Sequence, residues 1–226
     1  MEFFDRLLVE TKAERTAFLT IPVLQRALHE GVDIGLYLGF LGQAYQHVKH
    51  TVPLLSLAMS HCRPADTVYR EALQCYIAEE TGHDEWILDD IRALGGDADS
   101  VRAALPGLPC RLMLAYAYYA IQHIDPYALL GMVHVLEGMS VALAQLGADA
   151  VRRRLAVDGD AGFRYLTSHG ALDQDHVAMF RNLVNRIGDR AAQQHIIDTV
   201  KLMYGLYGDI FRALDGGMAR GESHAA

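Results

Sequence analysis

Residues 162–187 read GFRYLTSHGALDQDHVAMFRNLVNRI. Through most of this stretch, the residues of one face recur at alternating intervals of three and four positions. Such spacing predicts one face of an α-helix that is turned toward a core. The second half of the face is apolar, from Phe180 to Ile187. The first half has polar side chains where a core needs apolar ones, namely His169, Asp173 and His176. Two histidines and a carboxylate on one buried face favour a metal site over a single hydrogen-bonded core histidine.

Helical spacing of the same kind continues along most of the 226 residues. We expect eight main helices and one short helix at 98–104, the main ones covering residues 2–17, 21–30, 34–61, 66–94, 108–123, 126–155, 162–187 and 190–214. Pro53 should kink the helix in which it lies. Gly216-Gly217 should end the last helix and leave 217–226 as a disordered tail. With no long linker and no repeat, the sequence predicts a single all-α domain over 1–226.

The bulk composition excludes several classes of protein. A net charge of −8 argues against nucleic acid as a partner. The three cysteines, Cys62, Cys75 and Cys110, are widely spaced and form no CxxC motif, which indicates a reducing compartment. The N-terminus lacks the features of a signal peptide, and no stretch of about 18 uninterrupted apolar residues predicts a membrane span. We therefore expect a cytoplasmic protein with no membrane partner.

A second set of polar residues interrupts the apolar face of the stretch 66–94. That face passes from Tyr76 to Ile87 through Glu80 and His83, which form an ExxH motif. The neighbouring acidic side chains are expected to fall mostly to the sides of the helix, namely Glu79, Glu85, Asp89 and Asp90. ExxH on a helix is the arrangement that helical di-iron carboxylate proteins use. The alternative is a surface ion pair near a helix end.

The third unusual residue is Glu137, the one formally charged residue in the stretch 129–146, which reads LLGMVHVLEGMSVALAQL. An ionised carboxylate is costly to bury unless it meets a cation. Glu137 is therefore a metal ligand, a protonated acid or the partner of an arginine from elsewhere in the chain.

Together the three stretches supply three carboxylates and three imidazoles, and no thiolate. Hard oxygen ligands mixed with imidazole nitrogen suit iron, or alternatively manganese, better than structural zinc. Six ligands are more than one catalytic ion needs. They fit two metal ions that keep open positions for dioxygen and a substrate, with Glu137 as the bridging carboxylate.

The order of these motifs resembles a known family. ExxH is followed about 54 residues later by a lone glutamate, and HxxxDxxH begins about 32 residues after that. This order, with YIAEETGHDEW at 76–86 and AYQHVKHTVPLL at 44–55, is similar to that of the heme-oxygenase-like di-iron oxidases and oxygenases. Their relatives are the thiaminase-II (TenA-like) and PqqC-type proteins. The resemblance covers roughly residues 20–215.

The resemblance implies a heme-oxygenase-like bundle of about seven to eight helices that forms a homodimer. It implies two iron ions per chain, and the matching ligand positions are Glu80, His83, Glu137, His169, Asp173 and His176. Some members place the first glutamate about seven residues before the histidine, where this chain has Tyr76. Glu79 therefore competes with Glu80 for the role of ligand.

The function implied by the resemblance is dioxygen activation on a small organic substrate, by oxidative C–C cleavage, N-oxygenation or desaturation. One alternative is a thiaminase-II-like hydrolase, which would need a cysteine nucleophile such as Cys75. A second alternative is a non-catalytic protein that binds a metal or a tetrapyrrole.

Three further side chains are candidates for supporting roles near the site. His47 and His50 share a helix face, and they are candidates for plain core packing, for heme binding, for orienting the metal ligands or for contacting substrate. Tyr76 is a candidate redox partner on the ligand-bearing face. We expect the substrate pocket to be lined by Phe40, Tyr116, Met132 and Met139.

Overall fold

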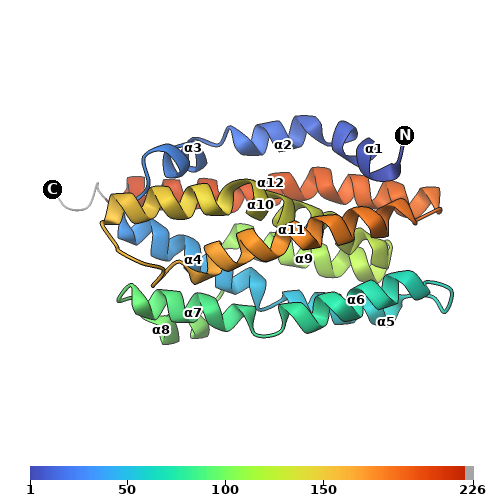
Figure 1. The fold of residues 1–226 in the computed structure, drawn as a ribbon, viewed down its shortest axis with the longest axis horizontal. Helices are drawn as coiled ribbons and strands as arrows, with labels where there is room; N and C mark the ends of the chain where they lie inside the picture. Colours follow the sequence, from blue (N-terminus) through green and yellow to red (C-terminus); the bar gives the residue numbers. More distant parts are fainter. Residues whose placement is uncertain (222–226) are drawn as a thin grey trace.

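The computed structural model describes residues 1–221, apart from the side chains of 169–175 and 217–221. Within this range there are no strands (Figure 1). The helices, in chain order, are α1 (Phe3–Glu10), α2 (Lys12–Leu19), α3 (Pro22–His29), α4 (Ile34–Val48), α5 (Thr51–His61), α6 (Thr67–Glu80), α7 (His83–Ala93), α8 (Ala98–Ala103), α9 (Leu108–His123), the short 3₁₀ helix η1 (Pro126–Ala128), α10 (Leu129–Leu155), α11 (Arg164–Asn185) and α12 (Arg190–Gly221). The predicted all-α class is confirmed, with more helices than expected.

Helix α10 is the centre of the bundle. It packs against α11 and α12 along their lengths and also contacts α3, α5 and α9. In Figure 1, α1–α3 run along one side of the bundle, over α12 and α10, and α5–α8 run along the other. Gly131 lets α10 approach α12 closely, because a Cβ atom there would lie 2.6 Å from Cβ of Thr199. The helix that contains Glu137 is therefore held on several sides by other helices.

Several predicted helices are interrupted, and the interruptions have local causes. The helix predicted at 2–17 breaks at Thr11. The helix predicted at 34–61 does not kink at Pro53 but stops after Val48 and restarts at Thr51. Pro53 lies in the first turn of α5, and because its ring nitrogen cannot bond to the carbonyl of residue 49, the helix cannot run through.

The helix predicted at 66–94 breaks inside the ExxH motif. Thr81 has φ −65° and ψ 116°, and Gly82 has φ 92° and ψ 0°. These angles are those of the two central residues of a type II turn, whose third position needs a positive φ and therefore favours glycine. Glu80 thus ends α6, and His83 begins α7.

The last helix also differs from the prediction. Instead of ending at Gly216-Gly217, α12 continues to Gly221. The rest of the predicted disordered tail, 222–226, lies outside the described residues.

One helix in residues 1–221 is long and apolar enough to cross a membrane when judged by length and composition alone. It is the stretch Pro126–Leu155, whose most apolar window has a mean hydropathy of 1.5 and is 56% buried inside the molecule. The central helix of a helical bundle has this composition, because it is surrounded by other helices.

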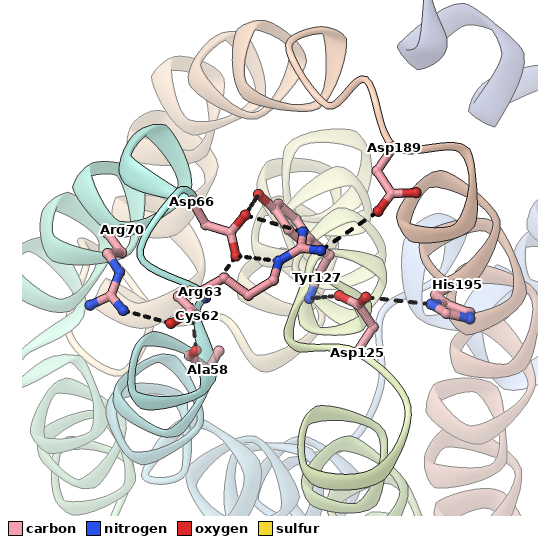
Figure 2. Close-up of polar contacts among 9 residues, drawn as sticks. All are labelled: Ala58, Cys62, Arg63, Asp66, Arg70, Asp125, Tyr127, Asp189 and His195. Atoms are coloured by element: carbon pink, nitrogen blue, oxygen red, sulfur yellow. Dashed lines mark hydrogen bonds and ion pairs between the residues drawn. The ribbon is translucent and has the colours of Figure 1, made fainter.

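A polar cluster joins three loops at one end of the bundle (Figure 2). The Arg63 guanidinium donates to both carboxylate oxygens of Asp66, and the Tyr127 hydroxyl donates to the same carboxylate over 3.2 Å. Burial acts to raise the pKa of Asp66, but the hydrogen bonds from Arg63 and Tyr127 outweigh it and lower that pKa. Arg63 also lies 3.9 Å from Asp189, which precedes α12. The cluster therefore fixes the start of α6 against η1 and α12.

Helix α1 covers a buried histidine on α10. The His134 ring stacks on Phe180 at 5.3 Å and meets the edge of Phe4 at 6.1 Å. Burial, with a smaller contribution from the charge of Arg15, lowers the pKa of His134 from its usual 6.5 to about 4. The folded protein therefore holds this imidazole neutral at a pH where the unfolded chain protonates it.

This difference predicts a specific loss of stability in acid. The contribution of His134 is complete above pH 6.5 and is lost as the pH falls toward 4, because only the unfolded chain takes up the proton. The shift corresponds to about 3 kcal/mol. In His134→Phe, the fall in the free energy of unfolding between pH 7 and pH 4, measured by urea titration, should be smaller than in the wild type by about this amount. His123→Phe, at an exposed position, serves as the control. Equal falls in both variants would contradict the assignment.

Candidate metal centre

Three helices bring three of the predicted ligands to one place. Glu80 comes from the end of α6, Glu137 from the middle of α10, and His176 from α11. One ligand atom from each of the three lies within 4.8 Å of the others. Their side chains are 9%, 12% and 6% exposed, respectively. Two carboxylates and an imidazole from distant parts of the chain therefore converge in the interior, as the sequence pattern predicts.

His176 occupies the middle of this group. Its Nδ1 atom is 3.3 Å from Glu137 Oε1 and 3.9 Å from Glu80 Oε1. Its Nε2 atom is 2.8 Å from Oε2 of Glu79, whose side chain is 51% exposed. The two competing glutamates therefore lie on opposite sides of the imidazole. Glu80 joins the buried group, and Glu79 is placed to hold the ring from the outside, as carboxylates commonly do for metal-binding histidines.

His83 lies next to the group through Glu80. Its Nδ1 atom is 3.1 Å from Glu80 Oε2, so the two oxygens of Glu80 face two different histidines. The His83 ring stacks on Trp86 at 4.1 Å, and the Arg164 guanidinium lies 4.5 Å above the same indole. The turn at Thr81-Gly82, and not a shared helix face, brings Glu80 and His83 together. The predicted proximity is therefore right and the predicted cause is wrong.

Tyr76 lies against the same group. Its hydroxyl donates a long hydrogen bond of 3.5 Å to Glu137 Oε2, and its ring meets the edge of the His176 ring at 5.5 Å. Burial and the nearby charge of Glu137 raise the pKa of Tyr76 far above its ordinary value. The phenol therefore keeps its proton and can act as a hydrogen-bond donor to Glu137.

The remaining predicted site residues divide into two groups. His169 and Asp173 lie within α11, but their side chains are outside the described part of the chain, so their role as ligands stays a prediction. His47 is buried and lines a cavity beside the carboxylates. His50 does not line this cavity, since it lies at the start of α5 with its Nδ1 atom 2.9 Å from the Tyr118 hydroxyl.

The cavity has a volume of about 200 Å³, and its wall includes Glu80, Glu137 and Tyr76. Phe40, Met132 and Met139 line it as predicted. The prediction for Tyr116 is wrong, because its ring is absent from the cavity wall and its hydroxyl lies 3.2 Å from Thr199. None of the three cysteines lines the cavity. Cys75 is exposed, and burial raises the pKa values of Cys62 and Cys110 to about 11.

Comparison with known proteins places this site in a family. Residues 38–208 match the sequence family described as iron-containing redox enzymes, which covers most of the chain. The chain belongs to this iron-containing redox enzyme family. No curated protein matches the sequence significantly.

Solved structures show the same fold as this iron-containing redox enzyme family member. A heme-oxygenase-like domain of unknown function from Shewanella denitrificans OS217 superposes with a TM-score of 0.88 at 16% identity, covering 100% of this chain and 97% of that one. A TenA homologue from Pseudomonas syringae pv. tomato DC3000 gives 0.80 at 10% identity, covering 95% and 93%. Heme oxygenase-1 from Synechocystis sp. PCC6803 in complex with heme gives 0.72 at 13% identity, covering 99% and 96%. The predicted heme-oxygenase-like fold is confirmed.

Asp90 is a site-building residue that sequence reasoning missed. The sequence places it to the side of its helix, yet it is buried, and its two carboxylate oxygens accept the backbone N–H groups of Arg164 and Tyr165 over 3.0 and 2.7 Å. Those residues begin α11, so Asp90 of α7 caps the helix that contains His176. Burial raises the pKa of Asp90, and the two backbone N–H groups oppose that rise. Its position three residues after Ile87, on the buried face of α7, is the signal that could have identified it.

Removing this cap should loosen α11. Asp90→Ala leaves two buried N–H groups at the helix start without an acceptor, so we expect the free energy of unfolding to fall by about 2 kcal/mol. Amide hydrogen exchange at Arg164 and Tyr165 should accelerate in the same variant. Urea unfolding of the metal-free protein measures the first effect and exchange mass spectrometry the second.

The adjacent Asp89 provides a matched control. It is exposed and pairs with Arg92, so Asp89→Ala should change the free energy of unfolding by no more than about 0.5 kcal/mol. If Asp90→Ala destabilises the protein no more than Asp89→Ala does, Asp90 is not the anchor of α11.

Proposed function

We propose that this chain is a non-heme di-iron oxidase or oxygenase that activates dioxygen and acts on a small organic substrate. One observation carries the proposal. Two largely buried carboxylates from different helices lie in the wall of a mostly apolar cavity and face the imidazole of His176. The cytoplasmic location, the homodimer and the absence of nucleic-acid and membrane partners stay predictions.

The charge of the group favours a bound cation. Glu80 and Glu137 both approach Nδ1 of His176, and Glu80 also lies 3.1 Å from Nδ1 of His83, so two carboxylates and two imidazoles share one small, largely buried volume. Like charges at short range in a buried site strongly disfavour ionisation of both groups. A di-cation between the carboxylates removes this repulsion and uses the oxygen and nitrogen atoms already present. The donors fit iron, with manganese as the alternative, because they combine carboxylate with imidazole and include no thiolate.

The proposed roles follow from position. Glu80, His83, Glu137 and His176, joined by His169 and Asp173 on α11, would hold two metal ions. Bound iron would supply the activation of dioxygen. The Nε2–H group of His176 would donate a hydrogen bond to the Glu79 carboxylate, which leaves Nδ1 turned toward the interior.

The side chains around the ligands have their own tasks. Tyr76 keeps its hydroxyl proton and directs it at Glu137 Oε2, which fixes the orientation of that carboxylate. The apolar wall keeps water from the reacting part of the substrate, which limits side reactions. Oxidative C–C cleavage, N-oxygenation and desaturation all suit this arrangement.

The cavity wall weighs against the hydrolase alternative. A thiaminase-like reaction needs a cysteine nucleophile in the pocket, and Cys75 lies exposed on α6 away from the cavity wall. The tetrapyrrole alternative depends on His47, which does line the cavity. A heme-loaded spectrum that changes in His47→Ala would support that alternative.

Anaerobic titration with ferrous iron tests the proposal. The wild type should bind about two iron ions per chain and show a new absorption band on exposure to dioxygen. Glu137→Ala and His169→Ala should lose this binding while circular dichroism shows unchanged helical content. Glu79→Gln, which touches the histidine from outside, should weaken iron binding by about tenfold.

Glu71→Ala and His123→Ala provide controls, since both replace exposed side chains of the same types on helices. The metal-free Glu137→Ala variant should also melt at a higher temperature than the metal-free wild type, because it no longer holds a second carboxylate close to that of Glu80. Unchanged iron stoichiometry in both Glu137→Ala and His169→Ala would refute the proposed site. Activity on thiamin that is lost in Cys75→Ser would favour the hydrolase.

A further inference from the structure

The cavity follows one face of α10. Its lining residues on this helix recur at helical spacing from Leu129 to Val151, and Glu137 lies between the two ends. From Glu137 to Gly147 the helix rises about 15 Å. The whole cavity has a volume of about 200 Å³, and its lining spans about 33 Å along the helix from Leu129 to Val151, so the cavity is narrow for its length. We call the part between Glu137 and α3 the distal arm.

The distal arm is apolar. Among the described residues that line the whole cavity, only Glu80 and Glu137 are formally charged, and there is no lysine or arginine. On α10 the wall of the arm continues through Ser140, Leu143, Ala144, Gly147 and Val151. A charged amino group or carboxylate would meet no opposite charge there and would be costly to bury. The part of a ligand that enters this arm must therefore be apolar.

Small residues make the space at the far end. Ala144 and Gly147 are the small members of the α10 face, and α3 covers them with Val23, Leu24, Ala27 and Leu28. A Cβ atom added to Gly147 would lie 3.8 Å from Cδ2 of Leu28, which is ordinary van der Waals contact. A larger side chain at 147 would therefore fit the fold but fill the arm. Gly147 and Leu28 face each other across the arm one helical turn before Val151, the last residue of α10 that lines it, so their size limits how far a bound ligand can reach.

We propose that the distal arm binds an unbranched aliphatic chain of the substrate and that Gly147 and Leu28 set the length of chain it accepts. A narrow, uncharged passage about 15 Å long suits a flexible chain of roughly 10 carbons better than a ring system. The substrate class is an aliphatic compound of medium chain length whose reacting part lies near Glu80 and Glu137. The assignment of a reacting part rests on the proposed function, whereas binding of the chain does not.

Binding of neutral 1-alkanols with 6 to about 14 carbons to the metal-free protein, measured by calorimetry, tests the proposal. Neutral head groups isolate the contribution of the aliphatic chain to binding, because they carry no charge that the carboxylates would attract or repel. Each added methylene should tighten binding about fourfold until the arm is full, at roughly 10 carbons, and further carbons should add nothing.

Gly147→Leu should fill the far end of the arm. Binding of the 12-carbon alkanol should weaken at least about tenfold, while that of the 6-carbon alkanol should stay within about twofold of the wild type. Leu28→Ala should move the limit to longer chains. This second variant keeps the test decisive if Gly147→Leu fails to fold.

Gly205→Leu is the matched control, because Gly205 lies on an exposed face of α12 and a Cβ atom there meets nothing within 4 Å. It should leave the whole chain-length series unchanged. The proposal is overturned if no alkanol binds, if Gly147→Leu and Gly205→Leu behave alike, or if naphthalene binds more tightly than the alkanols.

The outcome is separable from that of the iron titration. Normal iron binding without any dependence on chain length would remove this inference and leave the proposed function standing. A clear chain-length limit in a protein that binds no iron would support this inference and contradict the proposed function.

Discussion

The interior of the molecule holds two largely buried carboxylates that share one imidazole. Glu80 and Glu137 approach the same nitrogen of His176, although in sequence they come from separate helices. Like charges that are held together in an apolar interior repel each other and lose their hydration. The fold must hold them in place by packing, and α10, which contacts α3, α5, α9, α11 and α12, supplies Glu137. This cost makes sense if a cation offsets it, which links the packing of the bundle to metal chemistry.

Helix α7 connects the two parts of the site, the end of α6 and the start of α11. Its first residue, His83, contacts Glu80, and near its other end Asp90 caps α11. One rigid helix thus fixes the turn after α6 and the start of the helix that contains His176. The turn at Thr81-Gly82 supplies the change of direction, because Gly82 adopts a positive φ with open space around it. The two halves of the proposed metal site are therefore set relative to each other by the turn at Thr81-Gly82 and by the hydrogen bonds from the start of α11 to the Asp90 carboxylate.

The sequence predicts the all-α class and the grouping of Glu80, Glu137 and His176, because polar residues at helical spacing in an apolar face are visible in one dimension. It predicts the proximity of Glu80 and His83 for the wrong reason, since a type II turn and a helix both bring residues three apart together. Asp90 was missed and Tyr116 was misplaced because contacts between distant helices depend on how the helices rotate against each other. The roles of His169 and Asp173 stay predictions, since their side chains lie outside the described residues.

The solved structures with this fold include a heme oxygenase and a TenA homologue, and they are at most 16% identical to this chain. The fold alone therefore does not determine the chemistry, which must depend on the side chains of α6, α10 and α11. On α10 the acidic position and the small residues at 144 and 147 occupy one face, so helix geometry fixes the distance between them. An insertion of one residue would rotate one set about 100° from the other. If Glu137 binds metal and Gly147 limits substrate length as proposed, substitutions can change the two roles independently, but the uninterrupted helix fixes the distance between the two residues.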